Sequence, residues 1–436
     1  MKILLIKPSF YFKNKLYKEK KMFIVDLTLP YLAALLKQHK IKLVFETAEK
    51  INFNENTDLV MISCMSLQVK RAFEIADRFK KRGKKIIMGG FHPTFKPEEC
   101  LKHCDSVVVG EAEGVIQDLL EDIEKGRLKK IYQAKKLSDL KNLPVPKFNL
   151  INKKIISRFS AFPIQATRGC FRGCDFCSIN KFFGRTFRKR PVKDVIEEIK
   201  ASSRKLIFFV DDNLILDREY TKELFKELKK LKIRFFSQVD YTIVYDDELL
   251  HLAYRAGAIF LFIGFESVSI ESAKEAKKFA KPEDYGAAIK KLRDKGIMVM
   301  ASIMFGFDND KKDIFKKTLY FLEKNNVSLA SFWIVTPPPD SAFWEKLVIE
   351  KRLFKEDYYL HDGGASGAQI NFKPKNMDAN FLEKKYWKTF RKFYSLKSIF
   401  KRIILHPPRN ISTFLFLLFL NLYYRSKLIK GVHPQF

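Results

Sequence analysis

The sequence predicts an α/β fold in three parts: a doubly wound, Rossmann-like parallel sheet, a partial (β/α)6 barrel of the TIM type, and a mainly helical C-terminal region. Short, continuously apolar segments alternate with amphipathic helical segments, which is typical of parallel strands covered by helices. The alternation pauses at Leu143-Pro144-Val145-Pro146, whose prolines indicate a linker, and then restarts. We therefore expect domains at residues 1–145, 146–345 and 346–436.

The first domain is expected to contain five strands, at residues 2–6, 42–45, 59–63, 85–88 and 106–109. Helices are expected between them, at residues 29–39, 68–81 and 114–125. In open parallel sheets, ligands bind beyond the carboxyl ends of the strands. Gly89-Gly90 and Gly110-Glu111 follow two of these ends, so this edge is a candidate binding site.

The second domain is expected to contain six strands, at residues 164–167, 206–210, 234–239, 259–265, 299–305 and 329–335. Helices are expected at residues 192–201, 221–231, 247–256 and 282–295. Six strand–helix units are fewer than the eight of a closed barrel, so we expect a partial one. The chain after it is helical and basic, with a glycine-rich loop at residues 362–367.

The charge balance is strongly basic, with 82 lysines and arginines against 50 aspartates and glutamates, a formal net charge of +32. Such a surface attracts nucleic acid, anionic lipid headgroups and phosphorylated substrates. An AT-rich genome would produce the same lysine excess without any functional meaning. The first eight residues lack the pattern of a signal peptide. Three of the six cysteines fall within eight residues, which indicates metal binding in a reducing cytoplasm.

A densely apolar segment at residues 411–420 lies between basic residues near the C-terminus. It is shorter than the ~20 apolar residues of a membrane-spanning helix. Its length suits an interfacial helix, which would place the protein peripherally on the inner face of the membrane. The alternative is a helix buried in the C-terminal domain. The flanking basic residues are Arg409, Arg425, Lys427 and Lys430.

The strongest chemical signal is the C-x3-C-x2-C loop formed by Cys170, Cys174 and Cys177. Three thiolates on one tight loop can hold three irons of a [4Fe–4S] cubane and leave the fourth iron open. A zinc site would normally require a fourth cysteine or histidine nearby, and none lies close in sequence. The remaining cysteines are expected to be ordinary buried thiols: Cys64, Cys100 and Cys104.

This loop, with the aromatic Phe176 before the last cysteine, resembles the radical S-adenosylmethionine (SAM) superfamily over residues 161–337. The resemblance implies that SAM chelates the open iron and that the reduced cluster cleaves SAM to a 5′-deoxyadenosyl radical. That radical abstracts hydrogen from unactivated carbon. A reductant such as flavodoxin or ferredoxin is implied as a partner. The protein would supply position and exclusion of water, and no catalytic side chain is assigned.

Three further strand ends resemble SAM contacts of this superfamily. Asp211, Asp212 and Asn213 end the second barrel strand in a turn similar to the FxDDN motif. Gly264 and Glu266 belong to a segment that resembles the GxES motif, whose glutamate approaches the amino or ribose groups of SAM. Gly306 ends the fifth strand, where a backbone turn would face adenine, although residues 308–310 are more polar than the usual Gly-Pro turn.

The first domain resembles the cobalamin (B12)-binding domain of B12-dependent radical SAM proteins. No Asp-x-His-x-x-Gly motif follows its first strand. The resemblance therefore implies that cobalamin binds without a protein histidine on cobalt; the alternative is a degenerate domain that binds no corrin. Glycine allows the backbone to approach a ligand closely. The candidate cobalamin contacts are Ser63, Ser66, Gly89, Gly90, His92, Gly110 and Glu111.

The favoured function is cobalamin-dependent C-methylation of a hydrophobic small molecule, either lipid or tetrapyrrole-like. Residues 373–377 and the aromatic helix after them resemble family members that act on such substrates, although core packing would also explain the aromatic residues: Tyr386, Trp387, Phe390, Phe393 and Tyr394.

Three alternatives are weighed against methylation. A cyclase or rearrangement enzyme of the same architecture would use cobalamin in a non-methylating role. RNA modification, and with it a nucleic-acid partner, is disfavoured because no second cysteine cluster and no small C-terminal RNA-binding barrel occur. A non-enzymatic sensor or scaffold would leave the order of the SAM motifs unexplained.

Overall fold

The computed structural model describes residues 1–12, 14–277, 281–339, 341–361, 368–408 and 410–434, and it divides into two compact units. Both units are built on parallel sheets with helices, which confirms the predicted α/β class. Unit 1 comprises Met1–Pro163, Lys181–Gly184 and Glu356–Ser366. Unit 2 comprises Ile164–Asn180, Arg185–Lys355 and Gly367–Phe436.

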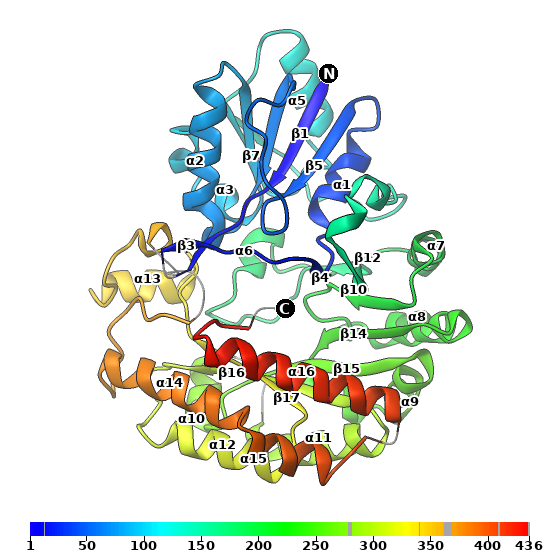
Figure 1. Cartoon of the computed structure of the whole chain (residues 1–436), viewed down its shortest axis with the longest axis vertical. Helices are drawn as coiled ribbons and strands as arrows, with labels where there is room; N and C mark the ends of the chain where they lie inside the picture. Colours follow the sequence, from blue (N-terminus) through cyan, green and yellow to red (C-terminus); the bar gives the residue numbers. More distant parts are fainter. Residues whose placement is uncertain (13, 278–280, 340, 362–367, 409, 435–436) are drawn as a thin grey trace. The chain divides into compact units, whose positions relative to one another are not determined.

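Unit 1 contains a six-stranded parallel sheet with the strand order β5-β1-β6-β7-β8-β9 (Figure 1). Its second strand, β1, is buried on both faces, and residues Ile3 to Ile6 are each at most 2% exposed. The strands are β1 (Lys2–Lys7), β5 (Lys40–Phe45), β6 (Leu59–Ser63), β7 (Lys85–Gly89), β8 (Ser106–Val109) and β9 (Ile131–Gln133). The main helices are α1 (Thr28–Leu35), α2 (Val69–Lys80) and α5 (Ile116–Glu124), with short α3 (Phe91–Phe95) and α4 (Pro97–Leu101).

The order of this sheet places β6, β7 and β8 side by side and parallel. Their carboxyl ends therefore lie at one edge, where Ser63, Gly89 and Val109 are the last strand residues. Unit 1 also contains strands that the sequence pattern did not predict, because they are short or half-polar. They are β2 (Tyr11–Phe12), β3 (Lys15–Leu16), β4 (Met22–Ile24), which pairs with β10 (Ile156–Ile164), and β9.

Unit 2 contains a parallel sheet in the order β17-β16-β15-β14-β13, curled as part of a barrel. The last residue of β10, Ile164, accepts a hydrogen bond from the Val210 N–H, which places the end of β10 beside β13. The strands are β13 (Leu206–Phe209), β14 (Arg234–Val239), β15 (Ala258–Glu266), β16 (Met298–Phe305) and β17 (Leu329–Ile334). The helices are α7 (Val192–Ser202), α8 (Arg218–Leu231), α9 (Asp247–Ala256), α10 (Ile270–Glu275), α11 (Tyr285–Asp294) and α12 (Ile314–Lys324), and α6 (Ile179–Phe183) begins in unit 2 and ends in unit 1.

The expected strand at residues 164–167 is divided in the structure. Residue 164 ends β10, and β11 (Thr167–Arg168) pairs antiparallel with β12 (Arg188–Lys189) outside the main sheet. The break occurs because the Arg190 N–H donates to the Ala166 carbonyl, which directs the chain away from the sheet. This short ribbon carries the chain into the cysteine loop.

The C-terminal region of unit 2 is helical, with α13 (Ala342–Ile349), α14 (Ala379–Phe393), α15 (Leu396–Ile399), the π-helical turn η7 (Phe400–Ile404) and α16 (Ile411–Ile429). The hydroxyl of buried Tyr386 donates to the Phe332 carbonyl at 3.0 Å. That of buried Tyr394 donates to the Ala330 carbonyl at 2.8 Å. Core packing against β17 therefore accounts for the aromatic helix α14. The expected glycine-rich loop at residues 362–367 and Arg409 lie outside the described residues.

A buried arginine fixes the last helix to this core. Arg402 is 1% exposed and donates to the carbonyls of Val327, Ser328 and Phe393 at 2.8 to 3.0 Å, and to Asn421 Oδ1 on α16 at 3.2 Å. Burial lowers the pKa of Arg402 to about 10, so the side chain stays charged at neutral pH. Removal of such a group would leave several buried acceptors unsatisfied.

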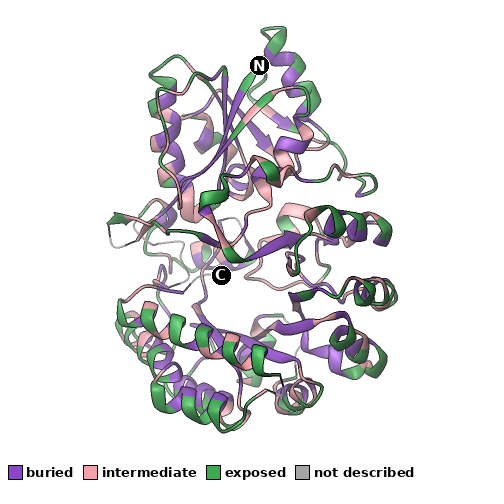
Figure 2. Ribbon diagram, turned by 45° about the vertical axis from the view of Figure 1, so that its right-hand side comes forward, coloured by how far each residue is buried: buried purple, intermediate pink, exposed green. Residues whose placement is uncertain are grey.

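The strands of both sheets are buried, whereas the outer sides of the helices are exposed (Figure 2). Across the described ranges, none of the helices combines the length and the apolarity that crossing a bilayer requires. The apolar segment at residues 411–420 forms the first half of α16.

Candidate functional site

The three cysteines lie on an irregular, partly exposed loop between β11 and α6 of unit 2. The loop begins at Gly169, whose φ is +87° and where a Cβ would lie 2.4 Å from the Thr186 carbonyl oxygen, so only glycine fits. The Cys177 N–H donates to the Cys174 carbonyl at 3.1 Å. Burial raises the pKa of the Cys177 thiol to about 12, and Cys174 and Cys170 add to the rise. The loop thus carries all three thiols within eight residues.

Two carboxylates at the end of β13, fully buried Asp211 and half-buried Asp212, hold the approach to this loop. Asp211 accepts hydrogen bonds from the backbone N–H groups of Ala166 and Thr167 and, at 2.6 Å, from the Thr167 hydroxyl. Asp212 accepts from the Gly169 N–H at 3.1 Å. Burial raises the pKa of Asp211 to about 7 and that of Asp212 to about 6. Both residues thus position the cysteine loop; their predicted contact with SAM stays a prediction.

Asn213, the residue after Asp212, is linked to the cysteine loop through the carboxylate of Asp240. Asn213 Nδ2 donates to Asp240 at 3.0 Å, and Arg172, in the middle of the cysteine loop, donates to the same carboxylate oxygen at 3.1 Å. Burial raises the pKa of Asp240, but hydrogen bonds from Thr242 and Asn213 outweigh it and hold the pKa below its ordinary value. Sequence reasoning missed Asp240 and Arg172, although Asp240 directly follows a predicted strand.

Glu266 ends β15 in an unusual backbone conformation. Its φ is +59°, and the pairing of β15 with β16 is irregular between Gly264 and Glu266. A non-glycine residue in the left-handed region costs of order 1 kcal/mol and is concentrated at functional sites. Glu266 is 7% exposed and Gly264 is half-buried opposite Ser302. The fold thus tolerates strain at the residue that was predicted to approach SAM.

The turn after β16 closes around a buried carboxylate. Asp310 accepts from the Gly306 N–H at 2.9 Å, from the Phe307 N–H at 3.2 Å and from the Ser272 hydroxyl at 2.6 Å. Gly306 has a φ of +104°, and burial raises the pKa of Asp310 to about 6. The Phe307 ring lies 6.2 Å, centroid to centroid, from that of Phe176 in an edge-on contact. This contact joins the turn to the cysteine loop.

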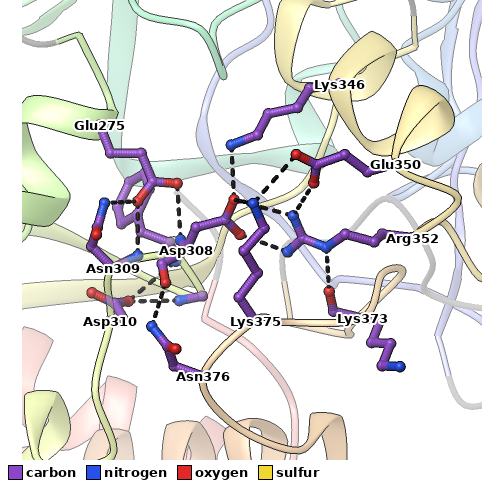
Figure 3. Close-up of polar contacts among 12 residues, drawn as sticks. Glu275, Asp308, Asn309, Asp310, Lys346, Glu350, Arg352, Lys373, Lys375 and Asn376 are labelled. Atoms are coloured by element: carbon purple, nitrogen blue, oxygen red, sulfur yellow. Dashed lines mark hydrogen bonds and ion pairs between the residues drawn. The ribbon is translucent and has the colours of Figure 1, made fainter.

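The neighbouring Asp308 connects this turn to the C-terminal region (Figure 3). Its carboxylate accepts from Arg352 at 2.6 and 3.1 Å and from Lys346 at 2.8 Å, and it lies 3.2 Å from Lys375 Nζ. Glu275 accepts from the Asp308 N–H at 2.9 Å. Burial raises the pKa of Asp308, but the hydrogen bonds from Arg352 and Lys346 outweigh it and hold the pKa at about 2.

In unit 1, the predicted glycines lie at the shared edge of β6, β7 and β8. Gly90 has a φ of +104°, and a Cβ there would lie 2.8 Å from the Cys64 carbonyl oxygen, beside buried Ser63. Gly89 accepts from the Cys64 N–H at 3.0 Å. The Gly110 N–H donates to the Thr94 hydroxyl at 2.9 Å, and none of the described atoms lies within 4 Å of its Cβ position. This edge is therefore formed largely by half-buried glycine backbone.

The polar candidates at this edge are held by neighbouring side chains. His92 is fully buried, its Nδ1 lies 3.1 Å from the Ser66 hydroxyl, and its Nε2 lies 3.7 Å from Glu99. Tyr359 donates to Glu99 at 2.8 Å. Glu111 is 7% exposed and accepts from the Ser138 N–H at 2.9 Å. The geometry gives His92 a role in holding Ser66; the predicted contacts of both with cobalamin stay predictions.

These residues fit the cofactors that the sequence predicts. Thiolates are the ligands of iron–sulfur clusters, and each of the three cysteines would bind a different iron of a cubane. Within the described ranges, no three His, Cys, Asp or Glu side chains converge on a single metal ion. The glycine edge of unit 1 offers backbone for a large planar ligand to approach. Cys64, Cys100 and Cys104 are buried, as expected.

Comparison with known proteins shows three matched regions. Residues 164–322 match the radical SAM superfamily, residues 21–120 match the B12 binding domain, and residues 341–409 match a domain of unknown function, DUF4070. Bacteriochlorophyllide d C-12(1)-methyltransferase of Chlorobaculum tepidum is 31% identical over 355 residues, which cover 79% of this chain and 76% of that protein.

Two further proteins are similar over most of the chain. Bacteriochlorophyllide d C-8(2)-methyltransferase of the same organism is 28% identical over 393 residues, covering 86% of each chain. The structure of the radical SAM methyltransferase TsrM from Kitasatospora setae, with tryptophan substrate and a SAM analogue bound, has a TM-score of 0.71 at 13% identity. That alignment covers 98% of this chain and 97% of TsrM.

The fold and the site thus define an iron–sulfur enzyme that uses SAM and carries a cobalamin-binding domain. The chain belongs to the radical SAM superfamily, in the subgroup whose members also contain a B12-binding domain. This confirms the family and the three cofactors predicted from the sequence: a [4Fe–4S] cluster, SAM and cobalamin. All candidate cluster and SAM residues lie in unit 2, and all candidate cobalamin residues lie in unit 1.

The strain at Glu266 predicts a trade-off between stability and SAM binding. Glu266→Gly and Glu266→Ala both remove the side chain, but only glycine relaxes at a φ of +59°. In urea titrations, we expect the free energy of unfolding of Glu266→Gly to exceed that of Glu266→Ala by about 1 kcal/mol. Both variants should bind SAM at least about tenfold more weakly than the native protein, as expected for loss of a charged hydrogen bond. Native SAM affinity in both would remove Glu266 from the site.

The ion pairs of Asp308 predict that removal of its charge lowers the stability of the fold substantially. Asp308→Asn removes one of the two carboxylates that pair with the buried Arg352 guanidinium, Glu350 being the other, and should lower the free energy of unfolding by about 2 kcal/mol. Since the pKa of Asp308 is depressed to about 2, this contribution is complete above the ordinary value of 3.8 and is lost as the pH falls through about 2. The deficit should therefore be equal at neutral and mildly acidic pH.

The matched control for this prediction is Asp294→Asn on α11. Asp294 pairs with Lys290 at 2.7 Å, but both side chains are more than half exposed. Exposed pairs contribute little, so the control should change the free energy of unfolding by less than about 0.5 kcal/mol. Equal losses in the two variants would contradict the account of Asp308.

Proposed function

We propose that this enzyme methylates a carbon atom of a hydrophobic small molecule, either lipid or tetrapyrrole-like, and that cobalamin is the methyl carrier. The observation that carries the proposal is the 31% identity, over 79% of the chain, to a methyltransferase that acts on a bacteriochlorophyllide. The presence of both a B12-binding domain and a radical SAM domain in one chain supports it. A generic low-potential protein such as flavodoxin or ferredoxin would supply electrons.

The cofactors, when bound, supply hydrogen abstraction from carbon and a methyl group. The side chains of unit 2 would bind and orient them. Cys170, Cys174 and Cys177 would hold the cluster, and Asp211 and Asp212 keep their loop in position through its backbone N–H groups.

Two aromatic rings of unit 2 contribute to the exclusion of water from the same region. Phe307 is 4% exposed and packs edge-on against Phe176, which lies next to the last cysteine of the loop. An apolar wall beside a reactive site protects reactive intermediates from water. Glu266 would meet the charged groups of SAM at the neighbouring strand end.

In unit 1, the backbone at the ends of β6, β7 and β8 would receive cobalamin. Gly90 and Gly110 keep that edge free of bulky side chains. His92 is fully buried beneath Ser66, so we propose that cobalt receives no histidine from this turn.

The test uses anaerobically reconstituted protein, with iron, sulfide and cobalamin counted per chain. We expect one [4Fe–4S] cluster and one cobalamin. With SAM that carries a trideuterated methyl group, and with bacteriochlorophyllide d as a probe substrate, mass spectrometry should find the label on cobalamin. Cys174→Ala serves as the control, since it should keep cobalamin and lose formation of 5′-deoxyadenosine. A protein that cleaves SAM but retains no cobalamin would lack the methyl carrier, and the proposal would fail.

A further inference from the structure

We propose that the outer face formed by α15, η7 and α16 in unit 2 docks on the surface of an anionic lipid bilayer. This surface, called here the tail face, is distinct from the candidate cofactor sites. Docking on a membrane is a property additional to methyl transfer. Its exposed apolar side chains are Leu396, Phe400, Ile404, Leu405, Ile411, Leu415, Phe419 and Leu422.

The outer side of α16 is apolar where a surface helix would normally be polar. Ile411, Leu415, Phe419 and Leu422 recur at spacings of three and four residues and therefore form one stripe. They are 70%, 57%, 57% and 43% exposed. The opposite side of the helix is mostly apolar, with Thr413 and Asn421 among its buried residues, and it packs against the rest of unit 2. A helix that is apolar on all sides requires a second apolar environment.

The outward stripe is fixed in its orientation by polar contacts on the inner side of α16. Asn421 donates to the Ser328 carbonyl at 3.2 Å and accepts from buried Arg402 at 3.2 Å. Tyr424 stacks on Tyr394 with ring centroids 5.0 Å apart. Rotation of the helix to bury the stripe would break these contacts. The fold therefore determines that the stripe faces outward.

The stripe continues onto the preceding segment through a shallow groove. Leu418 and Leu422 of α16 line it on one side, and Phe400 and Ile404 of η7 line it on the other. Lys397 and Lys401 line the groove mainly with the apolar stems of their side chains. The tail face is therefore one continuous apolar surface with lysines at its border.

The charge around this face identifies the occupant. Residues 384–436 contain twelve lysines and arginines and no aspartate or glutamate; five of the twelve lie on α14, which contacts α16, and Arg402 is buried. Each basic residue near an anionic bilayer adds about 1 kcal/mol of attraction, while the apolar side chains enter the headgroup boundary. A second copy of the chain would instead place one basic face against another, which is repulsive. The combination of apolar stripe and uniform positive charge therefore favours anionic lipid.

The tail face and the cysteine loop lie near opposite ends of the barrel strands. The start of α16 lies at the amino end of the barrel strands, since Thr413 accepts a hydrogen bond from Arg234, the first residue of β14. The cysteine loop lies near the opposite, carboxyl ends. Docking would thus retain the enzyme at the membrane without covering the cluster, and substitutions on this face should leave SAM cleavage unchanged.

The experiment is co-sedimentation of the full-length, reconstituted protein with vesicles of two compositions. Vesicles of phosphatidylcholine and phosphatidylglycerol in equal parts should bind the native chain, and pure phosphatidylcholine should bind it much more weakly. Phe419→Asp and, separately, Leu415→Asp should each weaken binding at least about tenfold, because an apolar anchor is replaced by a charge that the lipid repels. The matched control is Tyr320→Asp on α12, which changes an aromatic residue of similar exposure, 66%, and should bind as the native chain does.

A charge variant tests the electrostatic part independently of the apolar stripe. Lys397→Glu combined with Lys401→Glu should reduce binding to the anionic vesicles at least about tenfold. Unchanged rates of 5′-deoxyadenosine formation in all variants would show that each is folded. Two results would overturn the proposal: native-like sedimentation of Phe419→Asp, or a dimer in light scattering that Phe419→Asp dissociates, which would assign the face to a second copy.

Discussion

The cysteine loop depends on two carboxylates that follow β13, fully buried Asp211 and half-buried Asp212. The loop has almost no regular secondary structure, so its conformation must come from contacts made by the residues at its start. Asp211 binds the backbone of Ala166 and Thr167, and Asp212 binds the N–H of Gly169, directly before the first cysteine. Because Asp211 is fully buried and Asp212 is half-buried, their hydrogen bonds are largely protected from competition with water. The end of one barrel strand thus determines where the cysteines lie.

The remaining strand ends are tied to the same region. Asn213 and Asp240 extend the contact to Arg172 in the middle of the loop, and Phe176 packs on Phe307 after β16. Asp308 lies in the turn after β16 and connects it to the C-terminal region, which supplies its partners Lys346, Arg352 and Lys375. This region therefore supports the site from outside the barrel sheet as well as covering β17. The strained backbone at Glu266 is maintained within this rigid surrounding.

Much of the fold could be predicted from the sequence because parallel strands buried on both faces are continuously apolar. The strands of unit 1 at β1, β6, β7 and β8 and the barrel strands from β13 to β17 follow this rule. The predictions failed where pairing depends on distant residues. Short strands such as β4 and β9 have no strong pattern of their own, and β11 leaves the sheet through a hydrogen bond with a residue more than twenty positions away.

The site was predictable to a similar extent. Residues in local motifs could be predicted, the cysteines from their spacing and the Asp211 turn from its resemblance to the FxDDN motif. Arg172, Asp240, Arg352 and Lys375 were missed because their significance lies in partners that only the folded chain brings together. The aromatic residues of α14 illustrate the opposite case. Their composition suggested a site for a hydrophobic substrate, but Tyr386 and Phe390 are fully buried against β17.

The central claim is that three cysteines, on a loop held by the carboxylates of Asp211 and Asp212, present a cluster with one iron open to SAM. Electron paramagnetic resonance of the reduced, reconstituted protein, recorded with and without SAM, tests this claim most directly. We expect SAM to change the spectrum of the cluster, because direct coordination alters the electronic environment of the open iron. Identical spectra, at a SAM concentration where binding is shown by equilibrium dialysis, would contradict the account.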